Sequence, residues 1–187
     1  MNRKTNVTIL VAFLRGSRII GNSQTNSLPV GLNLPKDRKL MSDATKGHIV
    51  YMGRPTFESF PEAFRPLPER NNIILTTNKD YEPFPTNDDT CVCHTLEETV
   101  RFADAIATED NKEIFCFGGG NIYQQTLTHP LVFVKKIIAT IIDGDDLTGD
   151  VTFPEIDATL FKEVSRVHYE KQGKNTHSFD LVTYEHI

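Results

Sequence analysis

The chain has 187 residues, of which 39% are hydrophobic, and a formal net charge of −5 at pH 7. This length supports one domain with a full core, and the negative net charge without a long basic run argues against nucleic acid as a partner, because phosphate neutralisation needs clustered cations. Three cysteines, an odd number, favour reduced thiols over a disulfide framework, and no metal site is expected. Neither a secretory signal nor a membrane span is recognisable, which together with the thiols favours the cytoplasm.

Predicted strands and helices alternate along the chain. Short apolar runs predict strands at residues 7–13, 49–52, 73–76, 90–93, 113–117 and 135–142, and apolar residues at helical spacing predict helices at 35–45, 55–60, 96–108 and 121–127. Two alternating runs, 161–169 and 178–184, predict a β-hairpin. The expected fold class is α/β, a three-layer sandwich around a mixed, mostly parallel sheet of about eight strands with an antiparallel C-terminal hairpin.

The helix at 96–108 has the clearest pattern. Thr95 and Glu98 have the spacing of a capping box, in which each side chain binds the backbone N–H of the other residue. The expected apolar face comprises Leu96, Val100, Ala103 and Ala107.

Asp37 lies on the apolar face of the predicted helix 35–45. Pro35 suits the first turn of a helix, and Leu34, Met41 and Ala44 repeat with a helical period around Asp37. A buried carboxylate is costly unless it meets a partner or its pKa shifts, so Asp37 is a candidate functional group. A carboxylate that stabilises the helix dipole is an equal alternative.

Two arginines are candidates for anion contacts. Arg54 follows the strand 49–52 and begins a helix, where backbone N–H groups and a guanidinium can hold a phosphate. Arg70 ends the segment 65–70, whose two prolines restrict its conformation. Ordinary solvated arginines are the alternative at both positions.

Three consecutive glycines, Gly118, Gly119 and Gly120, connect a predicted strand to a predicted helix. Backbone without Cβ atoms can approach a ligand closely, and the start of a helix favours a phosphate. The segment therefore predicts a nucleotide-binding turn. A tight turn without a ligand is the alternative, and the spacing differs from G-x-G-x-x-G, so the glycines alone name no cofactor.

These motifs occur in the order seen in dihydrofolate reductases. The ordered set comprises Ile19-Ile20-Gly21, Leu28-Pro29, Leu34-Pro35-Lys36-Asp37, and the segments 52–59, 65–75, 117–123, 149–154 and 176–179. The chain closely resembles that family from Val7 to the final hairpin. The resemblance implies one dihydrofolate reductase domain over residues 1–187, working as a monomer. It also implies that NADPH reduces 7,8-dihydrofolate to 5,6,7,8-tetrahydrofolate, in support of one-carbon metabolism and thymidylate synthesis.

The resemblance assigns roles to individual residues. Asp37, assisted by Thr140, would pair with the 2-amino group and adjacent nitrogen of the pterin, while nitrogen 5 receives its proton through water. Arg70 would bind the α-carboxylate of the glutamate tail. The folate pocket would be lined by Val11, Leu34, Met41, Phe60, Leu67 and Phe117. NADPH would be bound by Ala12, Ile20, Gly53, Arg54, Pro55, Thr56, Thr76, Thr77, Gly118, Gly119, Gly120, Asn121, Ile122 and Tyr123.

Two loops resemble those of the family, and two positions differ from it. Residues 22–28 resemble the mobile lid of the family, and residues 143–150 resemble its supporting loop. The chain has no tryptophan, and Val30 stands where the family commonly has one. Met41 replaces an aromatic residue that often lies near the benzoyl ring. These departures predict altered folate affinity and antifolate sensitivity.

Two other functions are compatible with parts of the sequence. The pyrimidine reductase of riboflavin biosynthesis shares the triple glycine and the fold, but lacks the Pro-x-Asp helix start and the Arg-Pro-Leu-Pro-x-Arg loop. A non-catalytic nucleotide-binding module would keep the glycines, but has no reason to place Asp37 on an apolar face. The helix start and the arginine loop argue against the first alternative, and the position of Asp37 argues against the second, so the sequence favours folate reduction.

Overall fold

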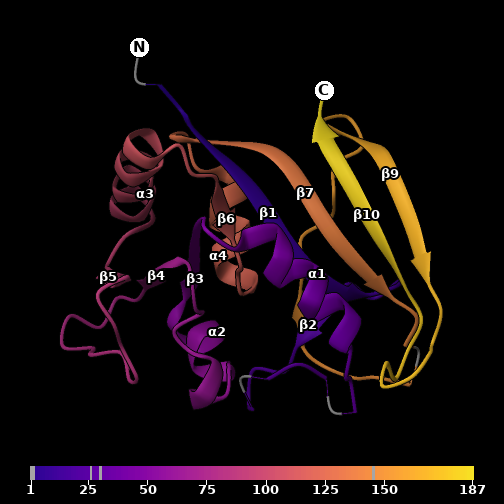
Figure 1. Cartoon of the computed structure of the whole chain (residues 1–187). Coiled ribbons are helices and arrows are strands. Elements are labelled where there is room, and N and C mark those ends of the chain that lie inside the picture. The colour runs from indigo at the N-terminus through magenta and orange to yellow at the C-terminus, as the bar shows by residue number, and fades with distance from the viewer. Residues whose placement is uncertain (1–2, 26, 30, 145) are drawn as a thin grey trace.

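An eight-stranded sheet forms the centre of the computed structural model, which describes residues 3–25, 27–29, 31–144 and 146–187 (Figure 1). The strand order is β5-β4-β3-β6-β1-β7-β10-β9. The strands are β1 Thr5–Leu14, β3 Ile49–Gly53, β4 Asn71–Leu75, β5 Thr90–Cys93, β6 Ile114–Cys116, β7 Val132–Ile142, β9 Phe161–Tyr169 and β10 Phe179–His186. From β5 to β7 in this spatial order, each strand runs parallel to its neighbour, whereas β10 runs antiparallel to both β7 and β9. This arrangement confirms the predicted sheet.

Helices cover both faces of the sheet and complete the three layers (Figure 1). Helices α3 (Leu96–Asp110) and α4 (Gly120–Thr128) pack on one face, and α1 (Pro35–Thr45) and α2 (Arg54–Ser59) pack on the other, near a short 3-10 helix, Glu62–Phe64. Strand β1 serves both faces because successive side chains alternate. Val11 therefore packs with α3 and α4, and its neighbour Leu10 packs with α2.

Helix α1 has the predicted bounds and has Pro35 in its first turn, but its buried face differs from the predicted one. Ala44 is exposed, whereas Thr45 is fully buried. The inward positions are thus Asp37, Met41 and Thr45, four residues apart, which is also a helical spacing. The pattern identified the face correctly near Asp37 and missed it one turn later.

Helix α3 confirms the predicted helix and the burial of Leu96, Val100 and Ala103, whereas Ala107 is only partly buried, and it corrects the capping box. The Glu98 backbone N–H donates to Thr95 Oγ1 at 3.1 Å, as expected. The Glu98 carboxylate, however, accepts from the backbone N–H of His94 at 2.7 Å, one residue before Thr95. This contact holds His94 at the end of β5.

A second sheet of two short strands is not apparent from the sequence. Strands β2 (Ile19–Gly21) and β8 (Val151–Thr152) pair in an antiparallel manner. Segments of three and two residues are too short to show alternation. Their pairing places the chain after Gly21 beside residues 149–150, where Asp150 N–H donates to Gly21 O at 3.2 Å.

A cluster of charged side chains joins β1 to the C-terminal hairpin. Asp180 on β10 accepts hydrogen bonds from Arg15 at 2.9 Å, Arg166 at 2.6 Å and His168 at 2.7 Å. Burial opposes ionisation, but these three donors hold the pKa of Asp180 at about 2, below its ordinary value of 3.8. The folded state therefore favours the charged carboxylate.

Asp180→Asn is expected to lower the free energy of unfolding at neutral pH by roughly 1–2 kcal/mol, because solvent screens the partners of the charge. When folding lowers the pKa of a carboxyl group, the group stabilises the folded state at any pH above its pKa in the unfolded chain. This stabilisation is lost as the pH falls towards about 2, the pKa of Asp180 in the folded state. Urea unfolding of both proteins at several pH values tests this expectation. A difference that stays constant down to the lowest pH would contradict the role of the charge.

Candidate functional site

A cleft of about 710 Å³ opens at the edge of the sheet where the parallel strands end. Ligands of α/β proteins bind at this edge, because the loops that follow the strands converge there. Most residues to which the sequence assigns the cofactor line the cleft: Ala12, Ile20, Gly53, Arg54, Pro55, Thr56, Thr76, Thr77, Gly119, Gly120, Asn121, Ile122 and Tyr123. Gly118 is not part of this lining, and the binding roles of the residues remain predictions.

The three glycines are explained by close packing as well as by the cleft. Gly118 has φ +82°, and a Cβ there would lie 2.3 Å from the ring of Tyr123. A Cβ on Gly120 would lie 2.9 Å from Val151. Gly118 O also accepts from the Gly53 N–H at 2.6 Å, so the turns after β3 and β6 are in contact. Gly119 and Gly120 also line the cleft. The three glycines are therefore compatible both with a tight turn and with a ligand-binding turn.

Arg54 lies at the start of α2 and lines the same cleft. Its Nε donates to Glu58 Oε1 at 2.9 Å, and its guanidinium carbon lies 4.7 Å from the ring centre of Tyr81. Nη1 and Nη2 have no hydrogen-bond partner among the residues that the structure describes. Both nitrogens are thus available to an anion in the cleft.

The sequence-based prediction missed His94 and Thr95, which also line the cleft. His94 Nδ1 lies 2.9 Å from the carbonyl oxygen of Thr76, and the bond from its backbone to Glu98 fixes the other side of the residue. The sequence position of His94 could have indicated this, because His94 directly follows β5 just as Thr76 directly follows β4. Residues that follow adjacent parallel strands meet at one edge of the sheet.

Asp37 is buried, with 8% of its surface exposed, and Thr140 Oγ1 donates to its Oδ1 at 2.5 Å. Burial raises the pKa of Asp37 above its ordinary value, and the hydrogen bond from Thr140 opposes this shift. Thr140 pairs with Ala12 in the sheet, and Ala12 lines the cleft, so the carboxylate lies near the cleft, although neither Asp37 nor Thr140 is part of its lining. This inward position favours a functional carboxylate over one that only stabilises the helix dipole.

The residues to which the sequence assigns the folate pocket are only partly brought together. One apolar cluster on the α1 and α2 face contains Met41, Phe60, Leu67 and Phe117. Leu34 packs in an adjacent cluster that includes Ala12. The Val11 side chain packs on the opposite face of the sheet, because side chains alternate along β1, and its place in the pocket stays a prediction.

Arg70 is fixed by hydrogen bonds between α1 and the loop before β4. Its Nε donates to Thr45 Oγ1 at 2.8 Å, its Nη2 donates to the carbonyl and hydroxyl of Ser42, and its Nη1 donates to Pro68 O at 2.7 Å. Burial lowers the pKa of Arg70. Because a guanidinium has five N–H donors, one Nη1 hydrogen remains for a ligand among the described contacts.

The segment that resembles a lid lies on the cleft. Asn22, Ser23, Ser27 and Leu28 line it. The backbone N–H of Ser23 donates to Asp150 Oδ1 at 2.7 Å, and the Ser23 hydroxyl donates to the other carboxylate oxygen. Ser23 thus connects the lid-like segment to Asp150 of the predicted supporting loop. Val30 lies outside the described residues, so its place at the position of the family tryptophan stays a prediction.

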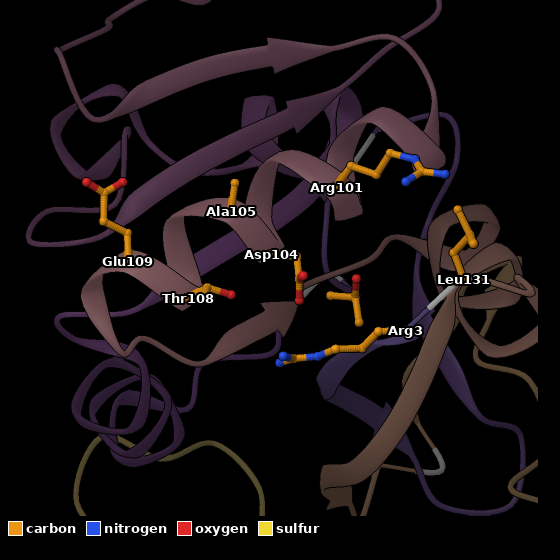
Figure 2. A pocket seen from close by; sticks show the side chains of 8 residues that line it. Arg3, Arg101, Asp104, Ala105, Thr108, Glu109 and Leu131 are labelled. Atoms are coloured by element: carbon orange, nitrogen blue, oxygen red, sulfur yellow. The ribbon is translucent and has the colours of Figure 1, made fainter. Parts of the chain in front are cut away.

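A second hollow, of about 470 Å³, lies between α3 and the start of β1 (Figure 2). Charges of both signs line it, including Arg3, Arg101, Asp104 and Glu109, and Arg101 already pairs with Glu97 at 2.9 Å. It shares no residue with the first cleft. Elsewhere in the described ranges, no three potential metal ligands converge and no helix is long and apolar enough to cross a membrane.

The fold and site together define a nucleotide-binding α/β protein with a buried carboxylate beside its cleft. A family model described as dihydrofolate reductase matches residues 6–186. A dihydrofolate reductase of Staphylococcus haemolyticus is 31% identical over 179 residues, covering 95% of each chain. Dihydrofolate reductase HdrB of Haloferax volcanii is 32% identical, covering 95% of this chain and 82% of that one.

A solved structure agrees with the sequence comparisons. Dihydrofolate reductase from Enterococcus faecalis, complexed with NADP(H) and RAB-propyl, is similar with a TM-score of 0.75 and 28% identity, covering 100% of this chain and 99% of that one. The chain belongs to the dihydrofolate reductase family.

Proposed function

We propose that this protein reduces 7,8-dihydrofolate to 5,6,7,8-tetrahydrofolate with NADPH. The observation that carries the proposal is the buried Asp37–Thr140 pair, which lies next to a residue of a cleft of nucleotide size, Ala12. Family membership supports the same reaction. A non-catalytic nucleotide-binding module does not account for a buried carboxylate at this position.

The cleft suits NADPH in size and in its polar groups. Its volume of about 710 Å³ is large enough for a dinucleotide, and Gly119 and Gly120 allow backbone contact. Arg54, Thr56 and Thr77 would bind the phosphates, with the start of α4 contributing free backbone N–H groups. Bound NADPH supplies the hydride.

Asp37 would bind the 2-amino group and the adjacent ring nitrogen of the pterin. Thr140 holds one carboxylate oxygen, which fixes the orientation of the other. The negative charge favours protonation of the pterin, and nitrogen 5 would receive its proton through water, because the carboxylate contacts another side of the ring. Met41, Phe60, Leu67 and Phe117 would provide apolar walls, and Arg70 would bind the glutamate tail.

The direct test follows the absorbance of NADPH with purified protein and either dihydrofolate or a pyrimidinedione substrate of riboflavin biosynthesis. Oxidation that depends on dihydrofolate is the expected result. Oxidation with the pyrimidinedione alone would favour the riboflavin-type reductase. NADPH binding without turnover of either substrate would favour a binding module.

Arg54→Ala is expected to narrow the preference for NADPH over NADH. Each charge-assisted hydrogen bond to the 2′-phosphate is worth roughly 1.5–3 kcal/mol, so the ratio of the two kcat/KM values should fall on the order of tenfold or more. Arg101→Ala is the matched control, because Arg101 lies in the other hollow. Equal use of NADPH and NADH by the unmutated protein would contradict the phosphate role.

We also propose that residues 1–187 act as a single-domain monomer in the cytoplasm. The candidate site is built from one chain, and Cys91, Cys93 and Cys116 are free thiols, as expected in a reducing compartment. Sedimentation equilibrium tests the monomer, and a mass near twice 21.1 kDa would contradict it.

A further inference from the structure

Tyr81 covers one side of the Arg54 guanidinium. The guanidinium carbon lies 4.7 Å from the centre of the Tyr81 ring, within the range of a cation–π contact. The ring packs against the apolar cluster that contains Met52 and Phe57, so the core holds it in place. Tyr81 is not part of the cleft lining, and it therefore acts on the cleft only through a neighbour.

The loop that carries Tyr81 is held by its own side chains. It follows β4 directly, and its first residues, Thr76 and Thr77, line the cleft. The Asn78 N–H donates to Thr76 Oγ1 at 3.2 Å, and the Asp80 N–H donates to Asn78 Oδ1 at 3.0 Å. These two turns connect the cleft residues Thr76 and Thr77 to Tyr81, which contacts Arg54.

Glu58 completes the surroundings of the guanidinium. Its carboxylate accepts from Arg54 Nε at 2.9 Å, one helical turn away. A tyrosine is already neutral at neutral pH, and burial, and then the negative charge of Glu58, raise the pKa of Tyr81 further. With Nε bound and one face covered by an aromatic ring, Arg54 is left with Nη1 and Nη2 for a ligand.

We propose that Tyr81 is a positioning residue that sets the preference of this site for a 2′-phosphorylated adenine nucleotide, by holding Arg54 against its ring face. This inference rests on the proposed phosphate role of Arg54. A long arginine side chain loses conformational freedom when it binds, and a guanidinium that is already held loses less. The contribution should therefore appear only with ligands that carry the 2′-phosphate.

The test measures binding by isothermal titration calorimetry with two probes, adenosine 2′,5′-bisphosphate and adenosine 5′-monophosphate. Tyr81→Leu keeps apolar volume but removes the ring, and should reduce the ratio of the two affinities by about fivefold. Tyr81→Phe keeps the ring and should leave the ratio within about twofold of the wild type. Melting temperatures of both variants show whether they fold.

Arg54→Ala and the double variant with Tyr81→Leu distinguish the role of Tyr81 from the proposed phosphate role of Arg54. If Tyr81 acts through Arg54, Tyr81→Leu has no further effect on the ratio once Arg54 is removed. An additive loss in the double variant, an equal loss for both probes, or an equal loss in Tyr81→Phe would overturn the inference while leaving the role of Arg54 intact. An unchanged ratio in Arg54→Ala would instead remove the proposed phosphate contact itself.

Discussion

Asp37→Asn is expected to lower kcat with dihydrofolate at neutral pH by about 10²-fold or more, the usual range for the loss of a group that assists proton transfer. The amide keeps the shape of the carboxylate and can still accept from Thr140, but it has no charge to favour a protonated pterin. Hydride transfer then depends on protonation of the substrate by solvent. Activity of the variant should therefore increase as pH is lowered, and a pH profile of kcat measures this directly.

The stability of Asp37→Asn separates a chemical role from a structural one. A buried carboxyl group whose pKa is raised by folding lowers the stability of the fold once pH exceeds its unfolded pKa. The amide removes this cost, so the variant should melt no lower than the wild type at neutral pH. Asp43→Asn on the exposed side of α1 is the matched control and should leave activity unchanged. Turnover of Asp37→Asn close to that of the wild type at neutral pH would overturn the assignment.

Gly118→Ala is expected to lower the free energy of unfolding by roughly 2–5 kcal/mol, the sum of a left-handed backbone and an overpacked core. The residue has φ +82°, and an added Cβ would lie 2.3 Å from the ring of Tyr123. That ring has little freedom to move, because its hydroxyl donates to Leu10 O at 2.6 Å and the side chain is buried. Denaturant unfolding gives the measurement.

Gly173→Ala is the matched control for the Gly118 variant. Gly173 also has a positive φ, of 63°, but an added Cβ would meet no atom within 4 Å. It should therefore show only the backbone cost, roughly 1–2 kcal/mol. Equal destabilisation by the two substitutions would mean that contact with Tyr123 does not require the glycine.

Local patterns in the sequence predicted the individual elements well. The strand at 161–169 and the helix at 35–45 have the observed bounds, because a hydrophobic period is a property of neighbouring residues. The same reasoning failed where the period was too short to be visible, at β2 and β8. The family resemblance assigned Val11 to the folate pocket, and the structure packs its side chain on the α3 and α4 face of the sheet, which alternation along a strand alone does not specify.

The carboxylate site shows the division between local and distant information. Periodicity placed Asp37 on the inner face of α1, but left a functional carboxylate and a helix-dipole carboxylate equally open. The structure brings Thr140, 103 residues away in the chain, to 2.5 Å from Asp37, and pairs it with Ala12 at the cleft. The family resemblance had implied this partner, whereas the pattern of the residues had not.

The sequence by itself determined the α/β class, the order of the elements, the inward carboxylate and the glycines between a strand and a helix. Only the tertiary structure decided that the ends of β1, β3, β4, β5 and β6 form one cleft, that His94 lines it, and that Tyr81 lies against Arg54. The physical reason is that secondary structure depends on interactions between near neighbours in the chain. A binding site depends instead on the order in which strands pair, which brings distant residues to one edge of the sheet.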